Sequence, residues 1–170
     1  AVIERALAKY DKVLIILGSA DKARDIKNPF TWRERQMMIS ATFGANPKLV
    51  FDRVRDYSND SAWITEIQKI CIGHQNDDQY ISIVGSDRDD STWYLKAFPQ
   101  WNLDLSDKFH DDLSAALVRS AYFNGDAEAW NKIEHRLPAT VVSFLQQFKN
   151  LTEYSVLKDE FEFIKNYKSA

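Results

Sequence analysis

The chain has 170 residues, of which 45% are hydrophobic and 28% charged, and its formal net charge at pH 7 is -3. This length suits one domain of ordinary size, so residues 1–170 are expected to form a single domain. The small net charge gives no reason to expect a nucleic-acid or membrane partner, and no apolar run reaches the roughly 18 residues of a membrane helix. A lone cysteine, Cys71, excludes an internal disulfide framework and fits a reducing compartment, so a cytoplasmic location is expected.

The first half of the chain alternates helical and strand patterns. An amphipathic helix at 1–10 leads directly into the apolar run 13–17, which is typical of a parallel strand covered on both faces. Thr31 followed by Glu34 is a capping-box pattern that begins the next helix. The further elements are the end of that helix near Gly44, strands at 48–51 and 80–84, and a helix at 60–72 that buries Trp63, Ile67, Ile70 and Cys71. This alternation predicts an α/β fold with a parallel sheet flanked by helices.

The last third of the chain reads as mainly helical. A loop rich in Asp and Ser follows Gly85, and a segment at 93–98 ends at Pro99. Helices are predicted at 113–123, 126–135, 139–148 and 153–167, with Pro138 at the start of the third. At the other end, a helix followed at once by a buried strand is the second half of a βαβ unit. The first strand of that unit is therefore expected upstream of Ala1.

Polar segments follow each of the three predicted strands, at 18–31, 56–63 and 85–94. In open α/β sheets, ligands bind beyond the carboxyl ends of the strands. Gly18 and Ser19 leave room for a ligand near the backbone, and Arg24 and Lys27 are cations suited to phosphate. Ordinary surface charge on a loop explains the same residues, so both interpretations stay open.

Two further candidates are equally open on composition alone. Ser114 lies near a helix start, where backbone N–H groups favour anions, with Arg119 about one and a half turns on; a capped helix with an exposed arginine explains them as well. Trp63 is suited to stacking on a planar base, although its apolar stripe also suits a core residue. The histidines His74, His110 and His135 lack zinc-ligand spacing, and no protein metal site is predicted.

Taken together, these segments resemble the nicotinamide mononucleotide (NMN) adenylyltransferases, above all the branch fused to a C-terminal Nudix hydrolase. Two departures stand out: Ala116 replaces the threonine of the Ser-x-Thr-x-x-Arg phosphate signature, and the His-x-Gly-His motif is missing because Ala1 begins about where it would end. The matching residues are 15–20, Arg24, 27–31, 34–35, Asp56, Asn59, Trp63, Gly85, Asp87, Asp90, Ser91, 93–95, 98–101 and 114–119.

The resemblance implies a Rossmann-like nucleotidyltransferase fold and transfer of AMP from ATP to NMN, which yields NAD and pyrophosphate. Mg²⁺ is expected to arrive with ATP, and ATP and NMN are the expected small-molecule partners. The resemblance assigns Arg119 and Lys27 to catalysis, Gly18, Ser19, Gly85, Asp87, Ser114 and Arg119 to ATP, Asp56, Asn59 and Trp63 to NMN, and Arg24 to phosphate as a further candidate.

Several alternatives remain. The acceptor is NMN or another phosphomonoester such as phosphopantetheine, and a non-catalytic NMN or NAD sensor is the alternative from another class. A homo-oligomer and a Nudix domain joined after a C-terminal helix at 151–170 are both left open as partners. Without the histidine motif, the 170-residue chain is itself expected to show little activity.

Overall fold

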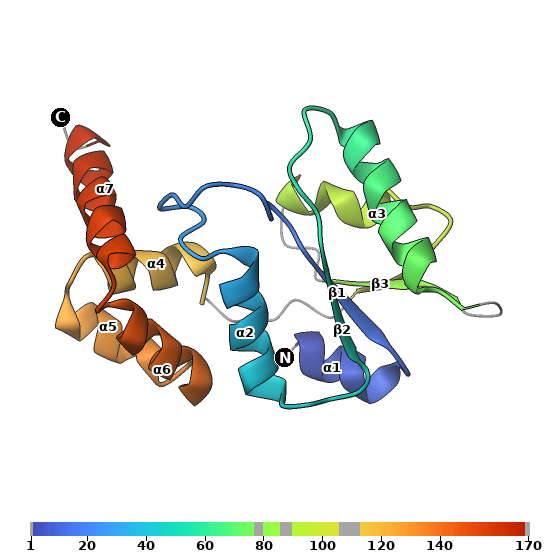
Figure 1. Ribbon diagram of the computed structural model, residues 1–170, viewed down its shortest axis with the longest axis horizontal. Coiled ribbons are helices and arrows are strands. Elements are labelled where there is room, and N and C mark those ends of the chain that lie inside the picture. Colours follow the sequence, from blue (N-terminus) through green and yellow to red (C-terminus); the bar gives the residue numbers. More distant parts are fainter. Residues whose placement is uncertain (1, 77–79, 86–89, 106–112, 169–170) are drawn as a thin grey trace. The chain divides into compact units, whose positions relative to one another are not determined.

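The computed structural model describes residues 2–76, 80–85, 90–105 and 113–168 (Figure 1). Its contacts divide the chain into two compact units. The strand unit comprises Ala1–Ala20 and Asn46–His110, and the helical unit comprises Asp21–Ala45 and Asp111–Ala170. Each unit is described by itself below, and the single domain expected for residues 1–170 stays a prediction.

The strand unit contains two separate pairs of parallel strands. In the first pair Val13 lies opposite Leu49, and in the second Ser82 lies opposite Asn102. Parallel pairing confirms the predicted α/β class, because parallel strands need crossover connections such as helices. The elements are α1 (Val2–Lys9), β1 (Val13–Leu17), β2 (Leu49–Arg53), α3 (Asp60–His74), β3 (Ser82–Gly85), the 3-10 helix η1 (Asp90–Lys96) and β4 (Asn102–Leu105).

Two features of these strands differ from the sequence analysis. Strand β1 has the predicted bounds, yet Val13–Ile16 are half-buried and only Leu17 is fully buried. The prediction that this strand is covered on both faces is therefore wrong. Strand β4 was not predicted, because its four residues Asn-Leu-Asp-Leu are too short and polar for a strand pattern. Its parallel hydrogen-bonded pairing with β3 makes this segment a strand although its own sequence does not favour one.

A small core holds the strand unit together. Val54, Ile67 and Phe98 are buried, and half-buried Ile16 of β1 and Ile83 of β3 pack against them. Among the four residues predicted on the buried face of α3, Ile67 is fully buried and Trp63, Ile70 and Cys71 are half-buried. Burial raises the pKa of the Cys71 thiol to about 11, which agrees with the packing role expected for it.

The helical unit contains the remaining helices, and their bounds agree with the predicted ranges to within about two residues. The predicted capping box is confirmed: Thr31 Oγ1 accepts from the N–H of Glu34, whose carboxylate accepts from the N–H of Thr31. Gly44 ends the first helix with a φ of 67°, a conformation that favours glycine. The elements are α2 (Trp32–Phe43), α4 (Ala115–Phe123), α5 (Ala127–Glu134), α6 (Ala139–Phe148) and α7 (Thr152–Lys168).

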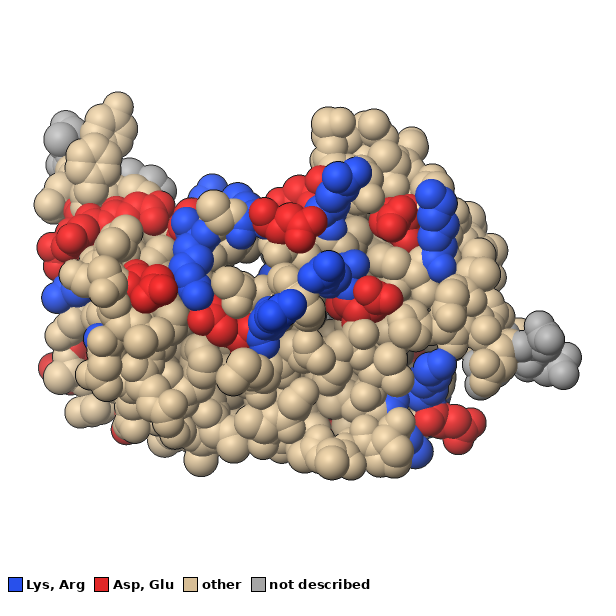
Figure 2. Space-filling model, in the orientation of Figure 1, with Lys and Arg blue, Asp and Glu red and all other residues tan. Residues whose placement is uncertain are grey.

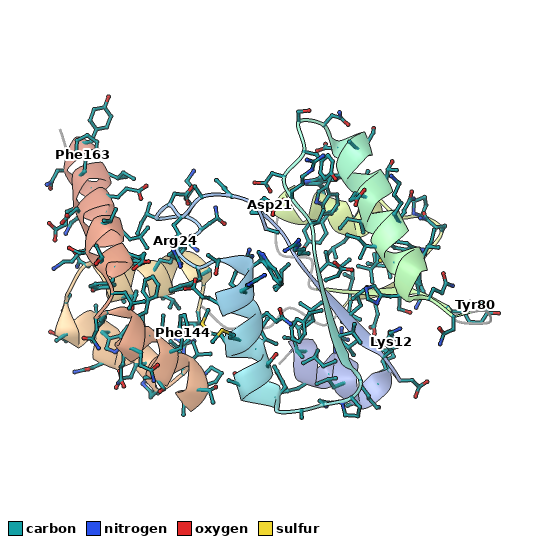
Figure 3. All side chains as sticks on the ribbon, in the orientation of Figure 1. Lys12, Asp21, Arg24, Tyr80, Phe144 and Phe163 are labelled. Carbon is teal, nitrogen blue, oxygen red and sulfur yellow. The ribbon has the colours of Figure 1, made fainter. Side chains whose placement is uncertain are left out.

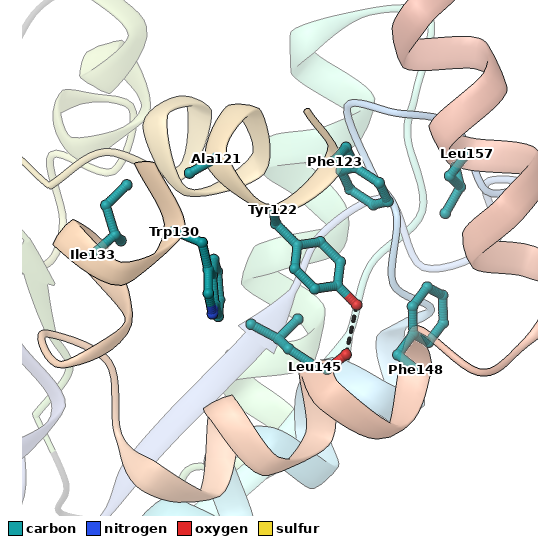
Figure 4. Close-up of a cluster of buried hydrophobic side chains, with 8 residues drawn as sticks. All are labelled: Ala121, Tyr122, Phe123, Trp130, Ile133, Leu145, Phe148 and Leu157. Carbon is teal, nitrogen blue, oxygen red and sulfur yellow. Dashed lines mark hydrogen bonds between the residues drawn. The ribbon is translucent and has the colours of Figure 1, made fainter. Parts of the chain in front are cut away.

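A large aromatic core fills the helical unit (Figure 4). Phe123 and Phe148 are the largest fully buried side chains. The Tyr122 hydroxyl donates to the Leu145 carbonyl at 2.6 Å, and burial raises the pKa of Tyr122. A buried hydroxyl without such a partner would cost about 1–3 kcal/mol. The cluster consists of Ala121, Tyr122, Phe123, Trp130, Ile133, Leu145, Phe148 and Leu157.

None of the helices in the described ranges combines the length and apolarity that crossing a membrane requires.

Candidate functional site

The carboxyl ends of β1 and β2 are joined by hydrogen bonds. The hydroxyl of Ser19 donates to Oδ1 of Asp56 at 2.8 Å, and the Ala20 N–H donates to the Val54 carbonyl at 3.1 Å. Ser19 has a φ of 50°, a left-handed conformation that costs a non-glycine residue about 1 kcal/mol or more. A Cβ placed on neighbouring Gly18 would meet no atom within 4 Å. The structure thus brings three predicted residues together beside open space at this edge.

The start of α3 carries the next two candidates. Asn59 is the N-cap, and its Oδ1 accepts from the Ala62 N–H at 2.8 Å. Trp63, one turn further on, is half-buried, and its ring centroid lies 5.9 Å from that of Trp93 and 6.3 Å from that of Tyr94. Trp63 therefore belongs to the core and also to an aromatic cluster that reaches the surface.

The sequence analysis did not select Trp93 and Tyr94 as site residues. Their side chains are 44% and 40% exposed, which leaves part of each ring open to solvent beside Trp63. Both lie in η1, in the segment that follows β3. The sequence did contain a signal for them. Four aromatic residues, Tyr57, Trp63, Trp93 and Tyr94, fall in the second and third polar segments, and such segments converge at one edge of a parallel sheet.

Packing explains why a glycine occupies position 85, at the end of β3. A Cβ placed there would lie 2.6 Å from Cδ2 of Leu95, whose side chain is only 3% exposed. Glycine lets the buried leucine of η1 approach the strand end. The predicted Asp87 lies outside the described residues, as do the side chains of Asp90 and Ser91.

In the helical unit, α4 begins with an exposed and capped turn. Ser114 is the N-cap and its hydroxyl accepts from the Leu117 N–H at 3.1 Å. Ala115 and Ala116 are exposed, and Arg119 in the second turn is half-buried. This confirms the helix start predicted from the sequence. The first turn of such a helix presents backbone N–H groups and the positive end of the dipole to solvent.

The loop before α2 is organised by Arg24 (Figure 3). Its Nη1 and Nη2 donate to the two carboxylate oxygens of Glu34 at 2.6 and 2.8 Å, and Nη1 also donates to the Pro29 carbonyl at 2.9 Å. Burial by itself raises the pKa of Glu34, but hydrogen bonds from Arg24 and Thr31 outweigh it and hold that pKa below its ordinary value. Arg24 thereby fixes the loop to the first turn of α2.

Lys27 lies in the tight turn that this loop makes. The N–H of Asn28 donates to the Asp25 carboxylate at 2.6 Å and to the Asp25 carbonyl at 3.0 Å, which closes the turn around Lys27. The Lys27 side chain is exposed. The exposed Lys27 ammonium is therefore carried by a turn that two hydrogen bonds close.

The described residues include no group of three or more His, Cys, Asp or Glu side chains placed to hold a metal ion. His74 and Asp52 form a pair, with Nε2 2.8 Å from Oδ2. A divalent cation that arrives with a nucleoside triphosphate is bound mainly by phosphate oxygens and water, with few protein ligands.

Parallel strands, helical crossovers and polar loops at the strand ends define a Rossmann-like α/β protein. No family model matches the sequence. A nicotinamide/nicotinic acid mononucleotide adenylyltransferase of Acinetobacter baylyi is 32% identical over 161 residues, which cover 94% of this chain and 83% of that relative. A nicotinamide-nucleotide adenylyltransferase of Sulfurisphaera tokodaii is 26% identical over 88% of this chain and 83% of its own length. The chain belongs to the NMN adenylyltransferase family of nucleotidyltransferases.

Solved structures agree with this assignment. Two structures of a bifunctional NMN adenylyltransferase/ADP ribose pyrophosphatase from Francisella tularensis match 98% of this chain, with TM-scores of 0.81 and 0.83 and 28% identity. One of them contains AMP and a manganese ion. This chain spans about half of those chains, 49% and 50% of their length. The predicted fold class and family are confirmed.

Proposed function

We propose that this protein transfers AMP from ATP to NMN, forming NAD and pyrophosphate. The observation that carries the proposal is the similarity to the A. baylyi adenylyltransferase over 94% of the chain. A continuous match of that extent includes residues 18–119, which contain every candidate site residue. The similarity to a relative whose name states this activity therefore spans the segments that hold the candidate site residues, which supports the proposal.

In the proposed reaction the NMN phosphate attacks the α-phosphorus of ATP in line and pyrophosphate leaves. The protein has no covalent step to perform, so its task is to position the substrates and to neutralise charge. We assign Arg119 and Lys27 to the phosphates as the catalytic cations, and Ser114 with the first turn of α4 to the same anions. Mg²⁺ would arrive with ATP as part of the substrate and would supply further neutralisation of the phosphate charge.

Arg24 has a different role in this proposal. Its guanidinium donates to Glu34 and to the Pro29 carbonyl at 2.6–2.9 Å, so its Nη1 and Nη2 atoms are engaged within the loop. We therefore place Lys27, which is exposed on the same loop, against phosphate. Arg24 supports it as a positioning residue.

The remaining assignments concern residues of the strand unit. We assign Gly18, Ser19, Gly85 and Asp87 to ATP, since they follow β1 and β3 at the strand ends. The open space over Gly18 supports this assignment. Trp63, with Trp93 and Tyr94 beside it, is assigned to stack on nicotinamide. The exposed Asp56 and Asn59 are assigned to the nicotinamide amide or ribose.

The setting of the reaction follows from composition and surface. We place it in the cytoplasm because a single cysteine suits a reducing compartment. Basic and acidic side chains are interspersed on the face in Figure 2, which suits small anionic substrates better than a polyanion. A fused Nudix domain, as in the bifunctional Francisella protein, and a homo-oligomer remain proposals for the whole protein.

The test measures binding and turnover with NMN and with phosphopantetheine as alternative acceptors in the presence of MgATP. NAD formation is followed with a coupled alcohol dehydrogenase, and binding by calorimetry, so that turnover and binding are measured separately. Binding of NMN and MgATP together with NAD formation supports the proposal. Phosphopantetheine turnover without NMN turnover refutes the acceptor. NMN binding without turnover indicates a sensor.

A matched pair of arginine variants tests the phosphate assignment. Arg119→Ala removes charge-assisted hydrogen bonds of about 1.5–3 kcal/mol, so the Kd for MgATP should rise roughly 10- to 150-fold. Arg33→Ala is the control, because Arg33 is an exposed arginine in the same unit, lying over the Trp32 ring. Equal affinity in the two variants would refute the role of Arg119.

A further inference from the structure

The loop that carries Lys27 is anchored to the core of the helical unit on both sides of the lysine. Ile26 and Phe30 pack against the buried aromatic cluster, and the Phe30 ring lies edge-on to that of Phe148, with 5.1 Å between the centroids. Lys27 itself is exposed. All four residues belong to the helical unit, so the position of Lys27 on this unit is decided by contacts within it.

Helix α7 contacts the backbone of the same loop. Oε2 of Glu160 accepts from the N–H of Ile26 at 3.1 Å. Leu157, one turn earlier on the same face of the helix, is buried in the aromatic cluster and only 2% exposed. The burial of Leu157 fixes this face of α7 against the core, and the half-buried Glu160 is thereby placed at the loop.

A second carboxylate engages the other backbone N–H groups of the turn. Asp25 accepts from the Asn28 N–H at 2.6 Å. Burial alone would raise the pKa of Asp25, but hydrogen bonds from Lys22 and from the backbone N–H groups of Asn28 and Lys27 outweigh it and hold that pKa below its ordinary value. Successive free N–H groups can form a concavity that binds anions. Here carboxylates of the protein take them, which leaves the side chain of Lys27 to contact a phosphate.

A lysine is a point charge on a flexible stem of four carbons. The reach and direction of its ammonium therefore depend on how firmly its backbone is held. The hydrogen bond from Ile26 to Glu160 fixes the residue directly before Lys27. Glu160 lies beyond Arg119, the last candidate site residue of the sequence analysis, and no motif selected it.

We propose that Glu160 is a positioning residue for phosphate binding: by accepting from the Ile26 N–H, it fixes the turn from which Lys27 reaches the triphosphate of ATP. The inference rests on the proposed function, since it requires Lys27 to contact phosphate. It gives α7 a part in the site, although this helix supplies no group that touches the substrate.

The test compares Glu160→Ala with Glu160→Gln and Glu162→Ala. Glutamine keeps an oxygen acceptor at about the same place without the charge. Glu162 is an exposed glutamate of the same helix, 3.8 Å from Lys158, and controls for the loss of a carboxylate from α7. The Kd for MgATP is measured by calorimetry and the exchange rate of the Ile26 amide hydrogen by NMR, while the urea midpoint confirms that each variant is folded.

Glu160→Ala should raise the Kd for MgATP about fivefold and speed exchange of the Ile26 amide about tenfold. Glu160→Gln and Glu162→Ala should change either quantity by less than about twofold. The effect on affinity should pass through Lys27. In a Lys27→Met background, Glu160→Ala should therefore leave the Kd unchanged, because residues that act through one another are not additive.

Three outcomes would overturn the inference while the proposed function stands. An equal rise in Kd with and without Lys27 would show that Glu160 acts only on the stability of the helical unit. A lower Kd in Glu160→Ala would show that its carboxylate competes with phosphate for the Ile26 N–H. Unchanged exchange of the Ile26 amide would show that Glu160 does not hold the turn.

Failure of the proposed function gives a different pattern. The unsubstituted protein would then bind no MgATP, or Lys27→Met would bind it as tightly as the wild type, while exchange of the Ile26 amide would still respond to Glu160→Ala. The inference would fall together with the phosphate assignment of Lys27, and the contact between α7 and the loop would be structural only.

Discussion

Glu34 should be the most sensitive charged residue of the helical unit, and replacing it with alanine tests the role of the Arg24 loop. Its carboxylate accepts from both terminal nitrogens of Arg24 and from the N–H and hydroxyl of Thr31. The Arg24 and Glu34 side chains are only 25% and 18% exposed. Glu34→Ala therefore removes the carboxylate half of the capping box and leaves a partly buried guanidinium without its carboxylate.

The magnitude follows from these contacts. The charge-assisted pair contributes about 1.5–3 kcal/mol, and the reciprocal cap contributes about 1 kcal/mol. Glu34→Ala should thus lower the free energy of unfolding by about 3 kcal/mol. With an m-value of about 1–3 kcal/mol/M, the urea midpoint should fall by about 1–3 M.

The matched control is Glu128→Ala. Glu128 pairs with Lys132 at the same 2.6 Å, but these side chains are 80% and 70% exposed. Exposed pairs of this kind contribute about 0.5 kcal/mol, so the urea midpoint measured by circular dichroism should barely move. Equal shifts in the two variants would refute the argument that burial and multiple donors make the Glu34 pair strong.

Three further predictions concern other parts of the molecule. Hydrogen bonds, first of all from Tyr10, hold the pKa of Asp104 below its ordinary value; its stabilising effect should therefore be full above about pH 4 and vanish as the pH falls through the lowered pKa. The difference in urea midpoint between the wild type and Asp104→Asn should shrink from pH 7 to pH 3, and a constant difference would contradict this. Ala116→Thr adds a hydroxyl to the exposed first turn of α4 and should lower the Kd for MgATP about tenfold; unchanged affinity would separate position 116 from the phosphates. Trp63→Ala should raise the Kd for NMN more than that for MgATP, with Trp63→Phe retaining part of the affinity; loss of the folded state in both variants would make Trp63 a core residue only.

Local features of this protein were predictable because their causes lie within a few residues of each other. The capping box of Thr31 and Glu34, the N-cap of Ser114 and the glycine that ends α2 depend on hydrogen bonds and backbone angles inside one turn. The unbroken apolar run of β1 predicted a strand with the observed bounds. These short-range rules explain why the helix ranges agree so closely with the structure.

Contacts between distant segments decided the rest. Nothing near Asp104 in the sequence predicts that its carboxylate accepts from Arg5 and Lys9 of α1 and from the hydroxyl of Tyr10, which follows that helix. The polar run of β4 becomes a strand only because β3 offers it a parallel edge. Arg24 and Lys27 are equally plausible phosphate ligands in the sequence. The structure distinguishes them, because Arg24 donates to Glu34 while the Lys27 side chain on the same loop is exposed.

In the candidate site, too, some features follow from the local sequence and others depend on contacts between distant segments. The sequence alone predicted which loops follow the strands, because apolar runs and the polar residues after them are local properties. Its resemblance to the family assigned Ser19, Asp56 and Trp63 to the substrates. Only the tertiary structure decided that Ser19 donates to Asp56, that Trp93 and Tyr94 extend the surface beside Trp63, and that β1 is left half-covered. Burial and pairing depend on neighbours far along the chain, which a local sequence pattern does not contain.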